Sequence, residues 1–527
     1  MTQSTQAVSR VDRPLFIATL AAILLVSIPI IGFHETAGAV ISQLFTLLTQ
    51  HFGVFYIWYG CGAVVILIWL AFGKYGDIKL SDVEHEPEFS LFSWIGMLFS
   101  AGVGAGLLYW AVIEWGFYID SPARGFAARS TEAIEYAAAY GVFHWGITGW
   151  AIFCLPTLAI AYPYYVRKVP YLRLSTACVA HLPNGVNSKR GRFIDFIYMI
   201  NLIGGSGTSL GLATPVIAAS LASIFGITHD FALEVAVVVL CVAIFGTSAF
   251  LGLSKGIKRL ADLNVFAALA LLFFVLAVGP TLFILKMGTN SVGLVLQEFI
   301  RFNTWTDPVE SSGFVESWTV FYWAWWIAYG PFVGIFVTRI SRGRTIRSVI
   351  LNMLLWGSLG AALFFIIFGN YAMYLDINNI LNVTGIMSDQ SPEAAITQVF
   401  LTLPAGEWAL ILFALVAIIF VATTYDSASY TLASVATDHL HAGAHPARWH
   451  RIFWAVGVGI LPCALMFIDG GIQVMLSTTI VASLPLLVVG VIMTSSLLKM
   501  LREDYQLYGC MTTPAARQRH AAALDRN

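Results

Sequence analysis

Large aromatic side chains are concentrated in one apolar segment, FYWAWWIAYGPFVG, which covers residues 321–334. Trp325 and Tyr329 are four residues apart, and Trp326 and Tyr329 are three apart, so in a helix these rings share one side. The ring faces of tryptophan and tyrosine attract cations, and they suit a quaternary ammonium group, which has no hydrogen to donate. The spacing therefore predicts an aromatic site for such a cation.

A second aromatic group lies earlier in the chain, in FHWGITGWAIF, residues 143–153. This segment places Trp145, Trp150 and Phe153 within about two turns of a helix. The alternative is that tryptophans mark the membrane–water interfaces, where they are enriched. That alternative fits four tryptophans near the ends of apolar segments: Trp58, Trp305, Trp318 and Trp408. It fits poorly with Trp325 and Trp326, which lie well inside their segment.

Hydroxyl side chains indicate a second kind of site in FVATTYDSASY, residues 420–430. Thr423 and Thr424 are adjacent in the middle of an apolar run. Such hydroxyls often bond to a carbonyl of the preceding helical turn. Alternatively, together with backbone carbonyls from another interrupted helix, they complete the all-oxygen shell that a hard cation such as Na⁺ needs.

Three ionisable residues fall inside apolar segments. Asp426 and Glu114 are functional candidates because acids within membrane helices are costly to bury. The structural alternatives are that Asp426 caps local backbone groups and that Glu114 accepts hydrogen bonds. For His144 we expect a hydrogen-bonded packing role.

The composition identifies the kind of element that must hold these residues. The chain is 58% hydrophobic and 11% charged, against about 25% charged in soluble domains. Continuous apolar runs long enough to cross a bilayer recur throughout, which indicates helices and not a barrel. We predict an all-α integral membrane protein with twelve spans, at 15–33, 53–73, 90–118, 138–164, 194–224, 232–252, 260–286, 316–338, 346–374, 408–435, 452–468 and 476–501.

The charge distribution predicts the orientation of these spans. Four of the 28 lysines and arginines fall in loops on the side opposite the termini: Arg124, Arg129, Lys286 and Arg301. By the positive-inside rule, both termini are expected in the cytoplasm. The six cysteines show no metal-ligand spacing, so we expect no cofactor apart from a coupling ion.

Two of the predicted spans contain helix-breaking residues. The third span carries Gly102, Gly104 and Gly106, and the eighth carries Gly330, Pro331 and Gly334. Interrupted helices at the first position of spans 3–7 and of spans 8–12 are typical of an inverted-repeat secondary transporter. The alternative is that the glycines only allow close helix packing. A break in the third span would free carbonyls near Ser100 and Val103 for a cation held by residues 423–424.

These motifs together resemble the betaine/carnitine/choline transporter family. The resemblance rests on AGVGAG at 101–106, FHWG at 143–146, TTYDSAS at 423–429 and the aromatic segment at 321–334, which is followed by RISRGRTIR. It extends from Arg13 to about Arg502. It implies a LeuT-like fold with two N-terminal helices before a five-plus-five inverted repeat, alternating access, and a homotrimer.

The resemblance divides the chain into six parts. These are a cytoplasmic N-terminus (1–14), two N-terminal transmembrane helices with a loop (15–89), a first inverted repeat (90–286), an outer amphipathic segment (287–315), a second inverted repeat (316–501) and a cytoplasmic tail (502–527).

The resemblance also assigns site residues by motif position. Four residues match the aromatic box, and two more line the path beside it: Trp145, Trp150, Phe153 and Trp326, with Trp325 and Tyr329. The glycines at 102, 104 and 106 are expected to offer backbone N–H groups to a substrate carboxylate. In sodium-coupled members the ion is held by carbonyls and hydroxyls at the positions of Ser100, Val103, Phe420, Thr423 and Thr424. A second sodium site is expected near Ser206 and Phe332, although Leu202 stands where a threonine hydroxyl would help.

The chain departs from related patterns at three positions. Tyr329 replaces a tryptophan of the betaine symporter and is more like the carnitine exchanger. Asn264 stands where the sodium-independent exchanger has an arginine, which favours sodium coupling here. Gly106 stands where choline carriers have an acid, which favours a zwitterionic substrate.

We therefore expect a secondary transporter, not an enzyme, in the cytoplasmic (inner) membrane of a bacterium. The expected cargo is a trimethylammonium zwitterion such as glycine betaine or carnitine, imported with sodium and used in osmoprotection. The expected partners are this substrate, membrane lipid and further copies of the chain, with no nucleic acid. Alternatives are a sodium-independent carnitine/butyrobetaine exchanger, a choline carrier, an intramembrane enzyme using Glu114, His144 and Asp426, and a membrane sensor without transport.

Overall fold

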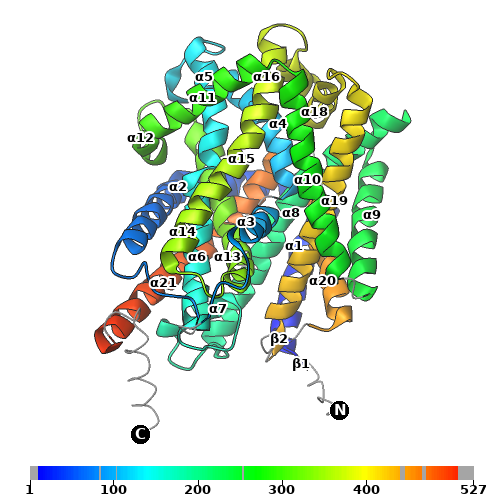
Figure 1. Cartoon of the computed structure of the whole chain (residues 1–527). Helices are drawn as coiled ribbons and strands as arrows, with labels where there is room; N and C mark the ends of the chain where they lie inside the picture. Colours follow the sequence, from blue (N-terminus) through cyan, green and yellow to red (C-terminus); the bar gives the residue numbers. More distant parts are fainter. Residues whose placement is uncertain are drawn as a thin grey trace.

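The structure is a computed structural model that describes residues 10–81, 85–102, 104–251, 254–438, 446–465 and 471–508. Its described part is a bundle of long helices, several of them nearly parallel (Figure 1). Two short strands, β1 (Arg10–Val11) and β2 (Thr437–Asp438), pair antiparallel with Arg10 opposite Asp438. The start of the described chain and the far end of α21 (Gly471–Tyr508) lie at the same end of the bundle (Figure 1).

The helices of the first half follow one another with short connections. They are α1 (Arg13–Gly32), α2 (His34–Phe72), α3 (Leu91–Gly102), α4 (Ala105–Ile119), η1 (Ala123–Gly125), α5 (Thr131–His144), α6 (Ile147–Tyr165), α7 (Leu174–Ala177), η2 (Val179–His181), α8 (Lys189–Phe225), α9 (Phe231–Leu251) and α10 (Ser254–Val278).

The second half begins with helices that turn away from the bundle axis. Its elements are α11 (Thr281–Gln297), α12 (Phe299–Thr304), η3 (Val315–Val320), α13 (Phe321–Ile340), α14 (Ile346–Asn352), η4 (Met353–Gly357), α15 (Ser358–Phe364), η5 (Phe365–Gly369), α16 (Asn370–Ile377), α17 (Val383–Asp389), α18 (Pro392–Leu401), α19 (Gly406–Val435) and α20 (Arg448–Leu465), followed by α21.

Eight helical segments of the described chain are long and apolar enough to cross a membrane. They coincide with the predicted first, second, fourth, fifth, eighth, ninth, tenth and twelfth spans. The predicted seventh span matches α10, which forms a bent apolar pair with α11 at an angle of 112°. The other three predicted spans lie on helices that are interrupted or that border residues outside the described ranges: α3–α4, α9 and α20.

The predicted break in the third span is present. α3 ends at Gly102 and α4 begins at Ala105, and Gly104 between them is extended, with φ −88° and ψ −176°. The glycines of this segment therefore do interrupt the helix. The expected consequence is that backbone groups on both sides of the break become available to a neighbour or a ligand.

The predicted break in the eighth span is wrong, because α13 is continuous from Phe321 to Ile340 with Pro331 inside it. The neighbouring glycines serve close packing against α6 instead. A Cβ at Gly330 would lie 3.4 Å from the Ile152 carbonyl oxygen, and one at Gly334 would lie 3.0 Å from the Thr157 nitrogen. The glycines of α13 therefore have the alternative role considered from the sequence, because small residues let two helix backbones approach closely.

A break that the sequence did not predict separates α5 from α6. Trp145 (φ −98°, ψ 6°) and Gly146 (φ −91°, ψ −149°) leave the helical conformation between His144 and Ile147. A Cβ at Gly146 would lie 2.5 Å from the Val142 carbonyl oxygen, so this turn requires glycine.

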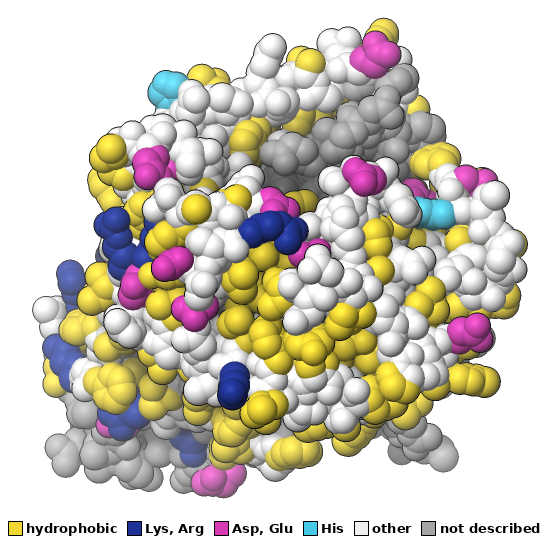
Figure 2. Space-filling model, turned by 90° about the horizontal axis from the view of Figure 1, so that it is seen from above, with side chains coloured by type: hydrophobic (Ala, Val, Ile, Leu, Met, Phe, Trp, Pro, Cys, Tyr) yellow, Lys and Arg dark blue, Asp and Glu magenta, His cyan; other side chains and the backbone are white. Residues whose placement is uncertain are grey.

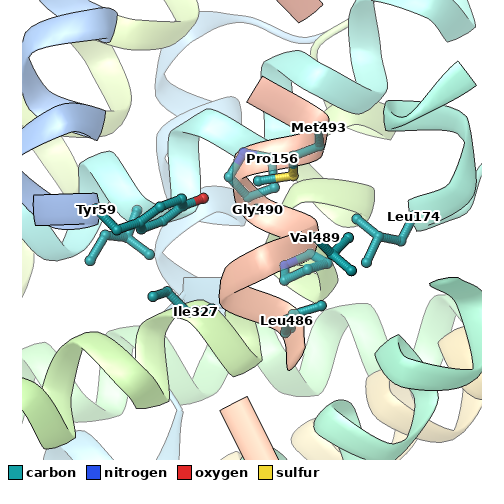
Figure 3. Close-up of a pocket in the computed structure, with 10 residues that line it drawn as sticks. Tyr59, Pro156, Leu174, Ile327, Leu486, Val489, Gly490 and Met493 are labelled. Atoms are coloured by element: carbon teal, nitrogen blue, oxygen red, sulfur yellow. The ribbon is translucent and has the colours of Figure 1, made fainter. Parts of the chain in front are cut away.

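A small apolar cavity of about 10 Å³ lies where α2, α6, α13 and α21 meet (Figure 3). Two helix-interior prolines line it, Pro156 of α6 and Pro331 of α13. Across it, Gly490 of α21 approaches Tyr59 so closely that a Cβ there would lie 2.8 Å from the Tyr59 hydroxyl oxygen. A cavity of this size is at the limit for a single water molecule, so it is not a substrate site.

Figure 2 shows the face at the top of Figure 1, where charged side chains lie singly or in small groups among hydrophobic ones. The core runs through α4, α6, α8 and α13, whose buried residues include Trp110, Trp323 and Trp325.

Candidate aromatic binding site

The tryptophans predicted to form a cation site lie against one another in the structure. The ring of Trp145, in the break between α5 and α6, is 4.7 Å from the ring of Trp326 and 5.8 Å from that of Trp325 on α13, both at steep angles. Trp325 and Trp326 are stacked, with ring centroids 5.0 Å apart and planes 10° apart. Adjacent positions of one helix thus present a pair of indoles to the break between α5 and α6.

The remaining predicted members extend this group along α6 and α13. Phe153 is 5.2 Å from Trp326 and 6.5 Å from Tyr329, and Trp150 is 5.6 Å from Phe153. The structure therefore brings all six predicted aromatic residues into one buried cluster, in which each side chain is at most 5% exposed. We call this set, residues 145, 150, 153, 325, 326 and 329, the aromatic cluster.

Hydrogen bonds and glycines fix the orientation of the indoles. Trp326 donates its Nε1–H to the His144 carbonyl oxygen, which is free because α5 ends there (3.0 Å). Trp325 donates to the Gly205 carbonyl oxygen on α8 (3.2 Å). A Cβ at Gly149 would lie 2.9 Å from Trp326 Nε1, so this glycine provides the space for the ring.

The arrangement is a closed one. A cation over an aromatic face lies within about 6 Å of the ring centroid, and here the faces of Trp325 and Trp326 cover each other while Trp145 lies 4.7 Å from Trp326. A trimethylammonium group can therefore enter between these rings only when they separate. The structure thus shows a set of ring faces packed against one another, without a gap for a cation between Trp325 and Trp326.

A buried acid lies directly behind the cluster. Glu114 of α4 accepts a hydrogen bond from Trp145 Nε1 (3.2 Å), one from the Tyr118 hydroxyl (2.7 Å) and one from the Tyr322 hydroxyl. His144 Nδ1 is 3.4 Å from the same carboxylate. Glu114 is 1% exposed, so its carboxylate oxygens find their hydrogen-bond partners in these side chains and not in water.

This acid links the aromatic cluster to a network that the sequence did not reveal. His144 also bonds Thr319 through Nε2 (3.1 Å), and its ring stacks on Tyr322 at 4.6 Å. Of the two roles considered for Glu114, hydrogen-bond acceptor and substrate-linked group, the structure shows the first. The bond from Trp145 Nε1 also joins Glu114 to the aromatic cluster.

The glycine segment of the broken helix lies beside the cluster. A Cβ at Gly106 would lie 2.9 Å from Cη2 of Trp325. Gly104 forms the N-cap of α4 and makes no side-chain cap, so the first turn of α4 is the kind of helix N-terminus at which an anion can accept backbone hydrogen bonds. Gly102 ends α3 on the other side of the break. The predicted carboxylate contact and the aromatic cluster are therefore neighbours.

The predicted cation-binding hydroxyls also lie close to this break. A Cβ at Gly104 would lie 3.8 Å from Thr424 Oγ1, which places α19 against the start of α4. The hydroxyls themselves bond back to their own helix: Thr424 to the Phe420 carbonyl (2.8 Å), and Thr423 to the same carbonyl (3.0 Å). The structure thus shows the back-bonding alternative, and the hydroxyl oxygens keep lone pairs for a cation.

The other predicted sodium ligands lie at the break and on α8 and α13. Val103 lies outside the described residues, and Ser100 belongs to the last turn of α3. At the predicted second sodium site, the Ser206 hydroxyl donates to the Leu202 carbonyl of its own helix. The Phe332 ring there is 4.9 Å from Tyr329.

Two other polar residues singled out in the sequence have separate roles. Asp426 forms an ion pair with Arg451 of α20 (2.8 Å), which ties α19 to α20. Asn264 of α10 is buried, and its side-chain oxygen has no hydrogen-bond partner within the described residues. These contacts do not place Asp426 among the aromatic side chains.

The fold and the site together define the class of protein: an all-α membrane transporter with a buried aromatic site at an interrupted helix. Comparison of the sequence with known protein families gives a match over residues 14–506 to "BCCT, betaine/carnitine/choline family transporter". The chain belongs to the betaine/carnitine/choline transporter family. This confirms the predicted family, the predicted LeuT-like class of all-α membrane fold, and the expectation of a transporter and not an enzyme.

Individual relatives agree with the family. The chain is 36% identical over 443 residues to the uncharacterized transporter YeaV of Escherichia coli K12. This alignment covers 84% of this chain and 92% of YeaV. The chain is 35% identical over 443 residues to a carnitine transporter of Acinetobacter baumannii, covering 84% and 80%. A solved Na⁺-coupled sialic acid symporter, in a substrate-bound outward-open state, aligns with 85% of this chain and 82% of its own at 10% identity and a TM-score of 0.35.

Proposed function

We propose that this transporter imports a trimethylammonium zwitterion of the glycine betaine or carnitine class and couples import to sodium. The observation that carries the proposal is the aromatic cluster, in which three indoles and a phenyl ring meet at the break between α5 and α6. Ring faces bind a quaternary ammonium without needing a hydrogen bond from it. The cluster would hold this group when the rings separate.

The negative end of the substrate would contact the break between α3 and α4. The free N–H groups at the start of α4 and the positive end of its dipole attract a carboxylate. Gly106 supports a zwitterion over choline, because a side chain at this position would collide with Trp325. An acid able to pair with choline is therefore not accommodated beside the rings.

Sodium coupling is supported by the position of Thr424 next to Gly104. An ion held by hydroxyls of Thr423 and Thr424, the Phe420 carbonyl and carbonyls near Ser100 and Val103 would tie α19 to the broken helix. Because the substrate uses the same break, ion and substrate would stabilise one conformation, and each would raise the affinity for the other.

The 35% identical relative named a carnitine transporter makes carnitine the first compound to test. The protein is reconstituted into proteoliposomes, and labelled carnitine uptake is measured against competing glycine betaine, butyrobetaine, choline and dimethylsulfoniopropionate. We expect uptake to need an inward sodium gradient and to be blocked by the zwitterions better than by choline. Full uptake without sodium would instead support the exchanger alternative, and choline as the best competitor would contradict a zwitterionic substrate.

The proposed setting is the bacterial inner membrane, with both termini cytoplasmic and three copies per assembly. The shared end of β1 and α21 is consistent with termini on one side. Labelling of single cysteines introduced at Arg13 and Lys286 in a cysteine-free variant tests the orientation. We expect a membrane-impermeant reagent to reach the first from the cytoplasm and the second from outside.

A further inference from the structure

A large surface cleft lies away from the aromatic cluster, beside the start of α8. Its volume is about 690 Å³, and it is bounded by α8, by the α7–η2 segment and by α21. These elements lie at the lower end of the bundle in Figure 1, the end that also holds β1 and the last turns of α21. The cleft therefore lies where the predicted spans 194–224 and 476–501 approach one membrane surface.

One edge of the cleft is basic. Lys189 and Arg190 line it from the first turn of α8, and His181 lines it from η2. All three side chains are exposed. Within the described residues, neither Lys189 nor Arg190 forms an ion pair, whereas the nearby Arg192 is paired with Asp12. Two uncompensated cations thus face the same opening.

The rest of the lining is apolar. Phe193 of α8 is 61% exposed and Val491 of α21 is 59% exposed, and both belong to the cleft. Leu182, Ile194 and Ile492 continue the same surface. Apart from Leu182, these side chains lie on α8 and α21, whose segments Lys189–Phe225 and Ser477–Leu507 are long and apolar enough to cross a membrane. The cleft therefore has a basic edge and an apolar wall.

The walls of the cleft are joined by hydrogen bonds. His181 Nε2 bonds Ser495 Oγ (3.1 Å), and the Ala180 backbone N–H donates to Ser496 Oγ (3.2 Å). Lys499 donates from Nζ to the Ala180 carbonyl (3.1 Å). These bonds fix η2 against α21, so the cleft is a preformed feature of the fold.

We propose that this cleft binds one anionic phospholipid. Basic pockets between transmembrane helices near a membrane surface recognise lipid phosphates. Lys189 and Arg190 would hold the phosphodiester, and an acyl chain would lie over Phe193 and Val491. A soluble phosphate would leave the apolar wall unused, and a zwitterionic lipid would leave the two cations without a net negative partner. The bound lipid would join α8, η2 and α21.

Native mass spectrometry of the delipidated full-length protein tests this proposal. Dioleoyl phosphatidylglycerol and dioleoyl phosphatidylcholine are titrated separately. We expect one phosphatidylglycerol per protomer to bind with clear preference over phosphatidylcholine. The double variant Lys189→Gln, Arg190→Gln should weaken that binding by roughly thirtyfold, at about fivefold for each cation lost.

The matched control is the double variant Arg13→Gln, Arg502→Gln, which removes the same charge from two exposed arginines outside the cleft. This control variant should bind phosphatidylglycerol like the wild type. The variant Phe193→Ser, which changes the apolar wall of the cleft, should bind phosphatidylglycerol more weakly. Thermal unfolding in detergent verifies that each variant is folded. The proposal is overturned if K189Q/R190Q retains the preference, if both double variants lose it equally, or if glycerol 3-phosphate displaces the lipid at a similar concentration.

Discussion

At the scale of single residues, Glu114 is the acid that contacts the aromatic cluster, and we expect it to affect the binding of a cation there. Its carboxylate receives the Trp145 indole N–H (3.2 Å) and two tyrosine hydroxyls while almost fully buried. A negative charge behind the ring edge attracts a cation on the ring face, and the N–H bond increases electron density in the ring. A residue that does not touch the cation can thereby change its affinity.

We predict that Glu114→Gln weakens substrate binding by roughly thirtyfold, since charges roughly 8 Å apart at an effective dielectric constant of about 20 interact by about 2 kcal/mol. Isothermal titration calorimetry with saturating sodium measures this change. Glu114→Asp, which restores the charge, should recover most of the affinity. Identical dissociation constants for wild type and Glu114→Gln would show that the Glu114 charge does not act on the substrate.

Trp326 contributes both a ring face and an anchoring bond. Trp326→Ala should abolish uptake, and Trp326→Phe, which keeps a ring but loses the bond to His144, should retain only part of it. The matched control is Trp323→Phe on the same helix, because the buried Trp323 Nε1 has no hydrogen-bond partner among the described residues. Uptake that falls equally in Trp323→Phe and Trp326→Phe would contradict a special role for Trp326.

The grouping of the six aromatic residues was predictable, because tryptophans in the middle of an apolar helix lie far from the membrane interfaces where tryptophan is usually enriched. Their partners were not. That Trp145 points at Glu114 depends on the backbone leaving the helix at Trp145 and Gly146, and one glycine in an apolar segment does not by itself predict such a turn. The close approach of α4 to α13 at Glu114 and Tyr322 likewise joins positions 208 residues apart.

At the scale of elements, the two breaks at α3–α4 and α5–α6 position the site. The first was readable from three alternating glycines, and the second is marked only by Gly146. The break expected at Pro331 is wrong, because the neighbouring glycines allow α13 to pack closely against α6. The sequence of α13 alone does not show which helix it packs against. Helix existence follows from local hydrophobicity, whereas helix interruption depends on neighbours.

The turn into α6 gives an element-scale prediction. Gly149→Ala would place a Cβ 2.9 Å from Trp326 Nε1 and 3.0 Å from the His144 carbonyl oxygen. We expect it to displace the Trp326 ring and reduce the uptake rate by about tenfold or more, as overpacking of about 1–3 kcal/mol predicts. Gly204→Ala is the matched control, since its Cβ would lie 3.6 Å from Ala482, an ordinary contact. Unaltered uptake in Gly149→Ala would show that the ring position tolerates the shift.

The contact between α4 and α19 gives a second prediction. Thr424→Val should raise the sodium concentration for half-maximal uptake by roughly tenfold, because a cation loses one oxygen ligand. Thr431→Val controls for the lost back-bond: Thr431 lies on α19, is buried, and bonds the Ser427 carbonyl in the same manner (2.9 Å). An equal shift in both variants would indicate a general effect on the helix and would count against a sodium site.

At the scale of the whole molecule, we propose that the two helix breaks, the aromatic cluster and the sodium site act together in a transport cycle. The closed cluster excludes a cation until its rings separate, so access requires movement of α6 relative to α13. Substrate and sodium would then favour the same conformation through the break at Gly104, which makes the downhill entry of the ion drive that of the substrate.

The central claim is that the aromatic cluster recognises the positive charge of a trimethylammonium group. Calorimetry with the purified protein in sodium compares the best-bound compound of the substrate panel with its tert-butyl isostere, in which carbon replaces the charged nitrogen. Shape and carboxylate are unchanged, so the difference reports the cation. We predict binding of the isostere to be weaker by roughly thirtyfold or more, from a desolvated cation–π contribution of about 2 kcal/mol. Equal affinity for the two compounds would contradict recognition of the charge by the aromatic cluster.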